Sequence, residues 1–160
     1  MISISISEVK TFMNHLLCKE TFDVFHVTEA ALSTYGNFSI DGHIHKDYYT
    51  PEEYEELYGN GYPLARWKQL RPMFFDLIRG KHTPLSFSIV FQMSRSGTEK
   101  FLSGLDTSFS ISDINGLFLN LRYESGQLTA VTGTSLKVFS LDRSLEQAWD
   151  NKIQKFILSL

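Results

Sequence analysis

The sequence has one cysteine, four prolines and no apolar run approaching the ~18 residues that a membrane-spanning helix needs. The lone Cys18 cannot form an internal disulfide bond, and no basic stretch followed by a long apolar run opens the chain. These absences argue against secretion and against a membrane span. We therefore expect a cytoplasmic protein with no membrane partner.

An excess of basic residues is also missing. Lysine and arginine number 15 against 18 aspartates and glutamates, which gives a net charge of -3. Nucleic-acid contact would therefore have to come from a local patch on a mildly acidic surface.

The chain is rich in large apolar and aromatic side chains that can form a core. Its 160 residues are 42% hydrophobic and include 13 phenylalanines, 7 tyrosines and 2 tryptophans. A chain of this length buries roughly 70% of its unfolded surface, which is enough for a core. We expect a single domain over residues 1–160.

The first half alternates between the periods of strands and helices. Residues 2–6 alternate isoleucine with serine, as in a half-buried strand, and residues 9–17 carry the apolar spacing of a helix. Two extended runs, 22–35 and 38–48, joined through Gly36-Asn37, predict a hairpin.

Two helices should follow this hairpin. Thr50-Pro51 is a strong helix start, and this helix should run to about Tyr58, where Gly59-Asn60-Gly61 ends it. A longer helix over residues 64–79 should be kinked or divided at Pro72.

The second half repeats the order of elements. Residues 85–93 alternate as a strand, residues 98–105 return to helical spacing, and 117–123 with 127–141 predict a second hairpin. A helix from about Asp142 closes the chain.

We predict an α+β fold of two pseudo-repeated strand-helix-hairpin-helix units, about 1–82 and 83–160, with helices on one side of an antiparallel sheet. Several landmark residues of the two halves fall at one constant offset: Gly42, Lys46 and Tyr48 correspond to Gly133, Lys137 and Phe139.

This repeat resembles the unit of DNA sliding clamps. Segments 115–119, 126–129 and 132–136 are similar to the hairpin of the bacterial clamp. The resemblance implies a clamp-like fold whose helices, at 8–19 and 97–105, would present Lys10 and Lys100 to DNA. A clamp ring contains several such domains, whereas this chain offers one with inserted helices. The whole sequence also resembles an uncharacterised bacterial family of intestinal Clostridia, a domain of unknown function, which implies no activity.

A denser set of basic residues could contact nucleic acid or another anion. It consists of Arg66, Lys68, Arg71, Arg79 and Lys81. The alternative is that these side chains form the solvated face of a helix and pair with the glutamates of residues 52–56.

A metal site is the second candidate. Asp41, His43, His45 and Asp47 are spaced by two, so on one strand they would share a face and could hold zinc or another divalent metal for hydrolysis. The alternative is a solvated strand face, because neighbouring alternate residues converge poorly without help from another element.

No catalytic residue is identified. Cys18 has His15 three residues before it but no orienting acid, and Gly59-Asn60-Gly61 lacks the spacing of a phosphate loop. We expect a non-enzymatic, clamp-like binding module without cofactor. It would contact a partner protein or a second copy of itself, with loose, sequence-independent nucleic-acid contact. The alternative is a metal-dependent hydrolase that uses the His-x-His strand.

Overall fold

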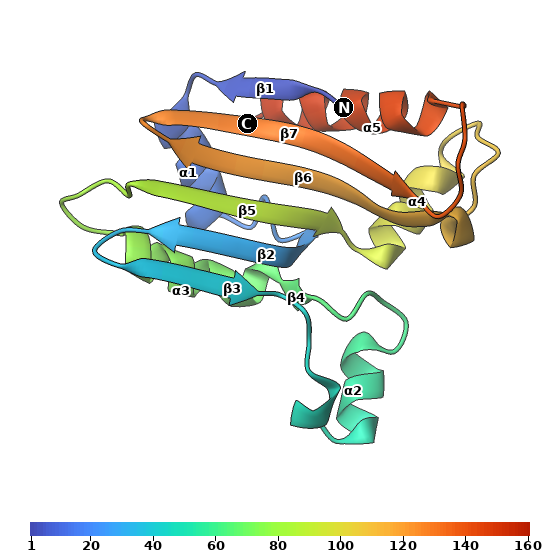
Figure 1. The fold of residues 1–160 in the computed structure, drawn as a ribbon, viewed down its shortest axis with the longest axis horizontal. Helices are drawn as coiled ribbons and strands as arrows, with labels where there is room; N and C mark the ends of the chain where they lie inside the picture. Colours follow the sequence, from blue (N-terminus) through green and yellow to red (C-terminus); the bar gives the residue numbers. More distant parts are fainter.

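The strands pair into one antiparallel sheet of seven strands in the computed structural model, which describes residues 1–160 (Figure 1). The strands are β1 Ser3–Ile6, β2 Phe25–Ser33, β3 Asn37–Asp41, β4 Ala65–Arg66, β5 Ser86–Met93, β6 Ile114–Glu124 and β7 Gln127–Leu136. The α-helices are α1 Val9–Leu17, α2 Pro51–Tyr58, α3 Trp67–Ile78, α4 Arg95–Ser103 and α5 Ser144–Leu158. This confirms the predicted α+β class. None of these helices combines the length and apolar character required to cross a membrane.

The strand order is β1-β7-β6-β5-β2-β3, and β4 pairs with β2 beyond the end of β3. Strands β6 and β7 form a long hairpin that lies between β1 and β5. Its register runs from Glu124 opposite Gln127 to Ile114 opposite Leu136. The turn between them places Ser125 and Gly126 at positive φ, which suits the Ser-Gly pair.

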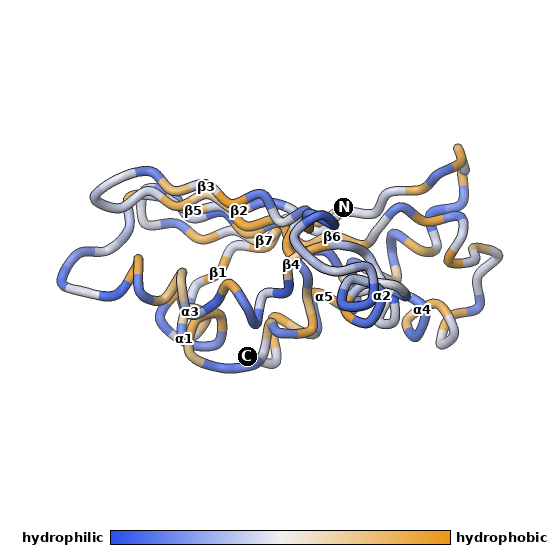
Figure 2. Tube along the Cα trace, turned by 90° about the horizontal axis from the view of Figure 1, so that it is seen from below, coloured by the Kyte–Doolittle hydropathy of each residue, from blue (hydrophilic) through white to orange (hydrophobic).

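Helices cover one face of the sheet only. Seen edge-on, the strands form one layer and α1, α3, α4 and α5 lie together beneath it (Figure 2). Alternation explains this arrangement: in β5, Phe87, Ile89 and Phe91 are buried, whereas Ser86 and Ser88 point to the open face.

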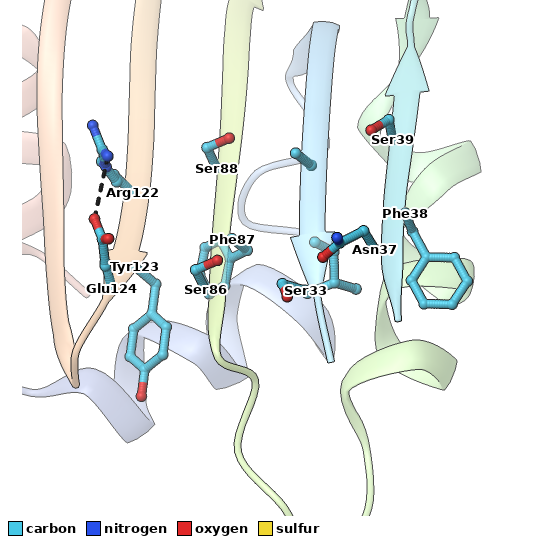
Figure 3. A pocket seen from close by; sticks show the side chains of 12 residues that line it. Ser33, Asn37, Phe38, Ser39, Ser86, Phe87, Ser88, Arg122, Tyr123 and Glu124 are labelled. Atoms are coloured by element: carbon cyan, nitrogen blue, oxygen red, sulfur yellow. Dashed lines mark hydrogen bonds and ion pairs between the residues drawn. The ribbon is translucent and has the colours of Figure 1, made fainter. Parts of the chain in front are cut away.

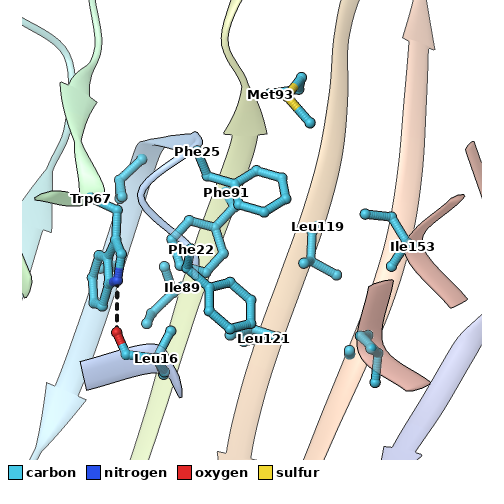
Figure 4. Packing of buried hydrophobic residues seen from close by; sticks show 14 of the residues in the cluster. Leu16, Phe22, Phe25, Trp67, Ile89, Phe91, Met93, Leu119, Leu121 and Ile153 are labelled. Atoms are coloured by element: carbon cyan, nitrogen blue, oxygen red, sulfur yellow. Dashed lines mark hydrogen bonds between the residues drawn. The ribbon is translucent and has the colours of Figure 1, made fainter. Parts of the chain in front are cut away.

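The core fills the space between sheet and helices. Phe22, Phe25 and Phe91 form an aromatic cluster with ring centroids 5.2–6.2 Å apart (Figure 4). Trp67 is fully buried beside them, and its indole N–H donates to the carbonyl oxygen of Leu16 at 2.9 Å. This hydrogen bond joins the start of α3 to the end of α1.

The helix that begins at Thr50-Pro51 is confirmed. The Thr50 hydroxyl oxygen accepts from the Glu53 amide at 3.2 Å, and α2 ends at Tyr58 as predicted. Pro72 does not divide the helix, because α3 continues through it to Ile78. This part of the prediction is wrong. Burial of Leu70 and Phe74 on the inner side holds the helix across the missing N–H.

The strand predicted over 38–48 is too long, because β3 ends at Asp41. Gly42 follows, where its amide donates to the carbonyl of Thr28 and its own carbonyl accepts from Ala65. A Cβ at Gly42 would lie 1.8 Å from the carbonyl oxygen of Val27. The chain therefore leaves the sheet at Gly42, and β4 takes the place of β3 beside β2.

The predicted pseudo-repeat is not confirmed. In the second half, β5, β6 and β7 are neighbours, whereas in the first half β1 lies at the opposite end of the sheet from β2 and β3 (Figure 1). The two halves share their element order but differ in strand pairing. The clamp-like topology inferred from that repeat is likewise not confirmed.

Candidate functional site

A groove opens on the helical side of the molecule between α4, α5 and the segment that leads into β2. Its volume is about 1010 Å³. We call it the α4–α5 groove. Its lining residues are Thr21, Val24, Phe25, Met93, Ser94, Ser96, Gly97, Lys100, Phe101, Gly104, Leu105, Lys152, Ile153, Lys155 and Phe156.

Local sequence positions both walls. Ser94 follows β5 and caps α4, because its hydroxyl oxygen accepts from the Gly97 amide at 3.1 Å. The Thr98 hydroxyl donates to the Ser94 carbonyl at 2.9 Å and secures the same turn. The opposite wall is α5, whose Trp149 and Ile153 are buried against the sheet.

Aromatic contacts attach the walls to the core. The Phe101 ring meets Trp149 edge-on with centroids 5.6 Å apart. Phe156 makes similar edge contacts with Phe22 and Phe25, at 5.3 and 6.1 Å. The groove is therefore a preformed feature of packed helices.

The floor of the groove is apolar. Phe25, Met93 and Ile153 are buried there, Phe101, Leu105 and Phe156 are partly exposed, and Val24 is 54% exposed. Apolar side chains gathered in a concavity offer area for a ligand to bury, at roughly 25 cal/mol per Å².

Three lysines border this floor, and no aspartate or glutamate lines it. Lys100 extends from α4, whereas Lys152 and Lys155 extend from α5. None of the three forms an ion pair. Glu99, the residue before Lys100, pairs instead with Arg95 at 3.3 Å. The Lys152 ammonium lies 5.7 Å from the centroid of the Phe101 ring. The groove thus combines uncompensated positive charge with apolar surface.

A second hollow, of about 580 Å³, lies on the open face of the sheet near the hairpin turns (Figure 3). Small side chains of Ser33, Ser39, Ser86 and Ser88 form its base. The charges at its side, Arg122 and Glu124, pair with each other at 3.2 Å (Figure 3). This hollow has the character of a solvated sheet face.

The four predicted metal ligands are not brought together. Because β3 ends at Asp41, the interpretation that they share one strand face is wrong, and Asp47 lies in a 3-10 turn over Lys46–Tyr48. His43 Nδ1 and Asp41 Oδ1 lie 2.6 Å apart. The backbone N–H and then the imidazole of His43 hold the pKa of Asp41 below its ordinary value. No three His, Cys, Asp or Glu side chains of the chain cluster suitably for a metal.

The predicted basic residues are divided among separate contacts. Arg71 makes two hydrogen bonds to Asp23, at 3.0 and 2.9 Å, and both side chains are largely buried. Arg79 pairs with Asp76 at 3.5 Å, and Arg66 donates to the Leu57 carbonyl at 3.2 Å. The four predicted lysines are all exposed: Lys10, Lys68 and Lys81 lie outside the groove, and Lys100 borders it. Nucleic-acid contact through these residues stays a prediction.

His26 is a titratable group that belongs to neither of the predicted residue sets. It lies on β2 opposite Arg66, and its Nδ1 is buried without a hydrogen-bond partner. Burial, and then the charge of Arg66, lower the pKa of His26 from 6.5. The folded chain therefore favours the neutral imidazole.

This environment predicts a loss of stability in mild acid. Below pH 6.5 the unfolded chain protonates His26 before the folded chain does, so the stabilisation is present above that pH and is lost as pH falls through the folded pKa. His26→Gln should reduce the loss of the free energy of unfolding as the pH falls below 6.5. Urea unfolding between pH 7.5 and 5 measures this, and equal slopes for both proteins would contradict it.

The model of the family of unknown function DUF5721 matches residues 15–159, and the chain therefore belongs to that family. No curated protein and no solved structure matches the chain.

Proposed function

We propose that the chain is a non-enzymatic binding module whose ligand site is the α4–α5 groove. The observation that carries this proposal is the set of three unpaired lysines, Lys100, Lys152 and Lys155, around an apolar floor that no acidic residue lines. A ligand with an apolar body and negative charge satisfies both features.

The charge of the groove contrasts with that of the whole chain. The net charge of the chain is -3, yet the only charged side chains that line the groove are positive. Local charge of this kind attracts anions and orients them as they approach. The apolar floor adds a contribution that phosphate groups alone would not use, so the ligand we propose is amphipathic.

The binding function is tested with the anionic, aromatic dye 8-anilinonaphthalene-1-sulfonate. Lys100→Glu/Lys155→Glu should weaken dye binding by about tenfold, because two attractions of about 0.5–1 kcal/mol each are lost. The measurement is a fluorescence titration at low salt, confirmed by calorimetry.

Lys68→Glu/Lys137→Glu is the matched control. It changes the net charge equally at exposed positions outside the groove. Circular dichroism verifies that both variants are folded. If the groove variant binds the dye as tightly as the control variant does, the α4–α5 groove is not the binding site.

A further inference from the structure

We propose that the occupant of the α4–α5 groove is an acidic amphipathic helix of a partner protein. This inference rests on the proposed binding function and adds the chemistry of the partner.

The lysines lie on both walls of the groove, α4 and α5. Lys100 extends from α4, Lys152 and Lys155 extend from α5, and the apolar side chains of Phe101, Leu105 and Phe156 line the groove with them. A helix with apolar residues at i, i+3, i+4 and i+7 has a continuous stripe that can lie on such a floor. Aspartates and glutamates on both sides of the stripe would then meet both walls.

A simple amphiphile fits this arrangement less well. One carboxylate or phosphate head group carries fewer negative charges than the three lysines carry positive charges, so it would leave part of the positive charge unpaired. The volume of about 1010 Å³ also lies at the upper end of the range for small-ligand pockets, near 300–1000 Å³. An element with several acids and several apolar side chains uses more of the groove.

A second copy of this chain is disfavoured by charge. Its most exposed apolar segment is Val138–Leu141, in which Phe139 is 90% exposed and Leu141 is 85% exposed. The charges beside this segment balance, because Arg143 pairs with Glu146 at 3.2 Å and Lys137 is matched by Asp142. A second copy would therefore bring no excess of negative charge to the lysines of the groove.

A single-stranded nucleic acid is disfavoured by the aromatic geometry. Bases stack on open ring faces, but the Lys152 ammonium lies over the ring of Phe101. Phe156 is engaged by Phe22 at an interplanar angle of 79°. Both rings serve as apolar floor, which suits leucine or isoleucine side chains.

The test uses a fluorescein-labelled synthetic peptide of about four helical turns, with a leucine stripe flanked by glutamates. One control peptide has the same composition in scrambled order, and another has lysine in place of each glutamate. We expect the acidic amphipathic peptide to bind at least tenfold more tightly than either control in fluorescence anisotropy. Lys100→Glu/Lys155→Glu should weaken it about tenfold.

A third variant tests the floor. Val24→Glu puts a carboxylate on an exposed floor position without disturbing the core, and it should weaken the acidic peptide severalfold. Lys68→Glu/Lys137→Glu should change binding less than twofold. This pattern would support the proposal.

Five outcomes would overturn it. Equal binding of the scrambled peptide would show charge attraction without a helix. If the protein bound the dye but not the peptide, the helical partner would be refuted and the proposed binding function would be kept. If it bound neither, both proposals would be refuted. Displacement of the acidic peptide by a thymidine oligonucleotide would assign the groove to nucleic acid. A dimer, seen by light scattering, that dissociates in Lys100→Glu/Lys155→Glu would assign it to a second copy.

Discussion

Replacing Trp67 with alanine is expected to lower the free energy of unfolding by about 3–5 kcal/mol, the range for removing a buried tryptophan. The side chain is 0% exposed and contacts Phe74 and Phe91 with ring centroids 5.2 and 5.3 Å away. Alanine would leave a cavity at the point where α3 meets the sheet. Urea unfolding followed by circular dichroism measures the loss.

Trp67→Phe separates packing from hydrogen bonding. Phenylalanine retains much of the ring volume but leaves the Leu16 carbonyl without the indole N–H that now donates to it at 2.9 Å. An unsatisfied buried acceptor costs about 1–3 kcal/mol, so this variant should lie between wild type and Trp67→Ala. If Trp67→Ala lost less than 1 kcal/mol, the packing described for Trp67 would be wrong.

Gly42→Ala is expected to destabilise the chain by about 3 kcal/mol, the upper part of the usual range for overpacking. The new Cβ would lie 1.8 Å from the Val27 carbonyl oxygen and 3.2 Å from that of Thr28. Both contacts are to backbone, so no side chain can rotate away. Relief requires β2 or the end of β3 to shift.

Gly61→Ala is the control for this substitution. A Cβ there meets nothing within 4 Å, and the change should stay within about 0.5 kcal/mol. Thermal and urea unfolding of the two variants provide the comparison. Similar stabilities would mean that the chain does not leave the sheet at Gly42 in the way described.

The sequence predicted correctly those helices and strands that residues within the same segment determine. The alternation of β5 and β6 reflects one buried and one open face, so period two is visible in the sequence. The start of α2 is set by Thr50 and Pro51, which act within a single turn. Such elements need no knowledge of the remaining chain.

Contacts between distant segments were not predictable in this way. The end of β3 at Asp41 depends on the close approach of Gly42 to Val27 and on the arrival of β4 beside β2. In the sequence, His43 and His45 continue the polar alternation, so the pattern predicts a longer strand. The pairing of β1 with β7 has no local signal either.

The groove was only partly visible in the sequence. Lys100 was selected as a DNA-facing residue, but Lys152 and Lys155 were not selected, because lysines on the outer side of a helix resemble a solvated face. Their significance depends on how closely α4 and α5 lie. The aromatic contact between Phe101 and Trp149 sets that distance, and a single sequence does not reveal it.

The position of β1 delays its docking while the chain is being synthesised. Its only neighbour in the sheet is β7, with Ser3 opposite Val131 and Ile6 opposite Leu128. At about 5–20 residues per second, the ribosome completes β7 roughly 6–25 s after β1 emerges. During that interval the partner strand of Ile4 and Ile6 has not been made, although β2, β5 and β6 are completed before β7. The pairing of β1 therefore has to wait for the last strand of the sheet.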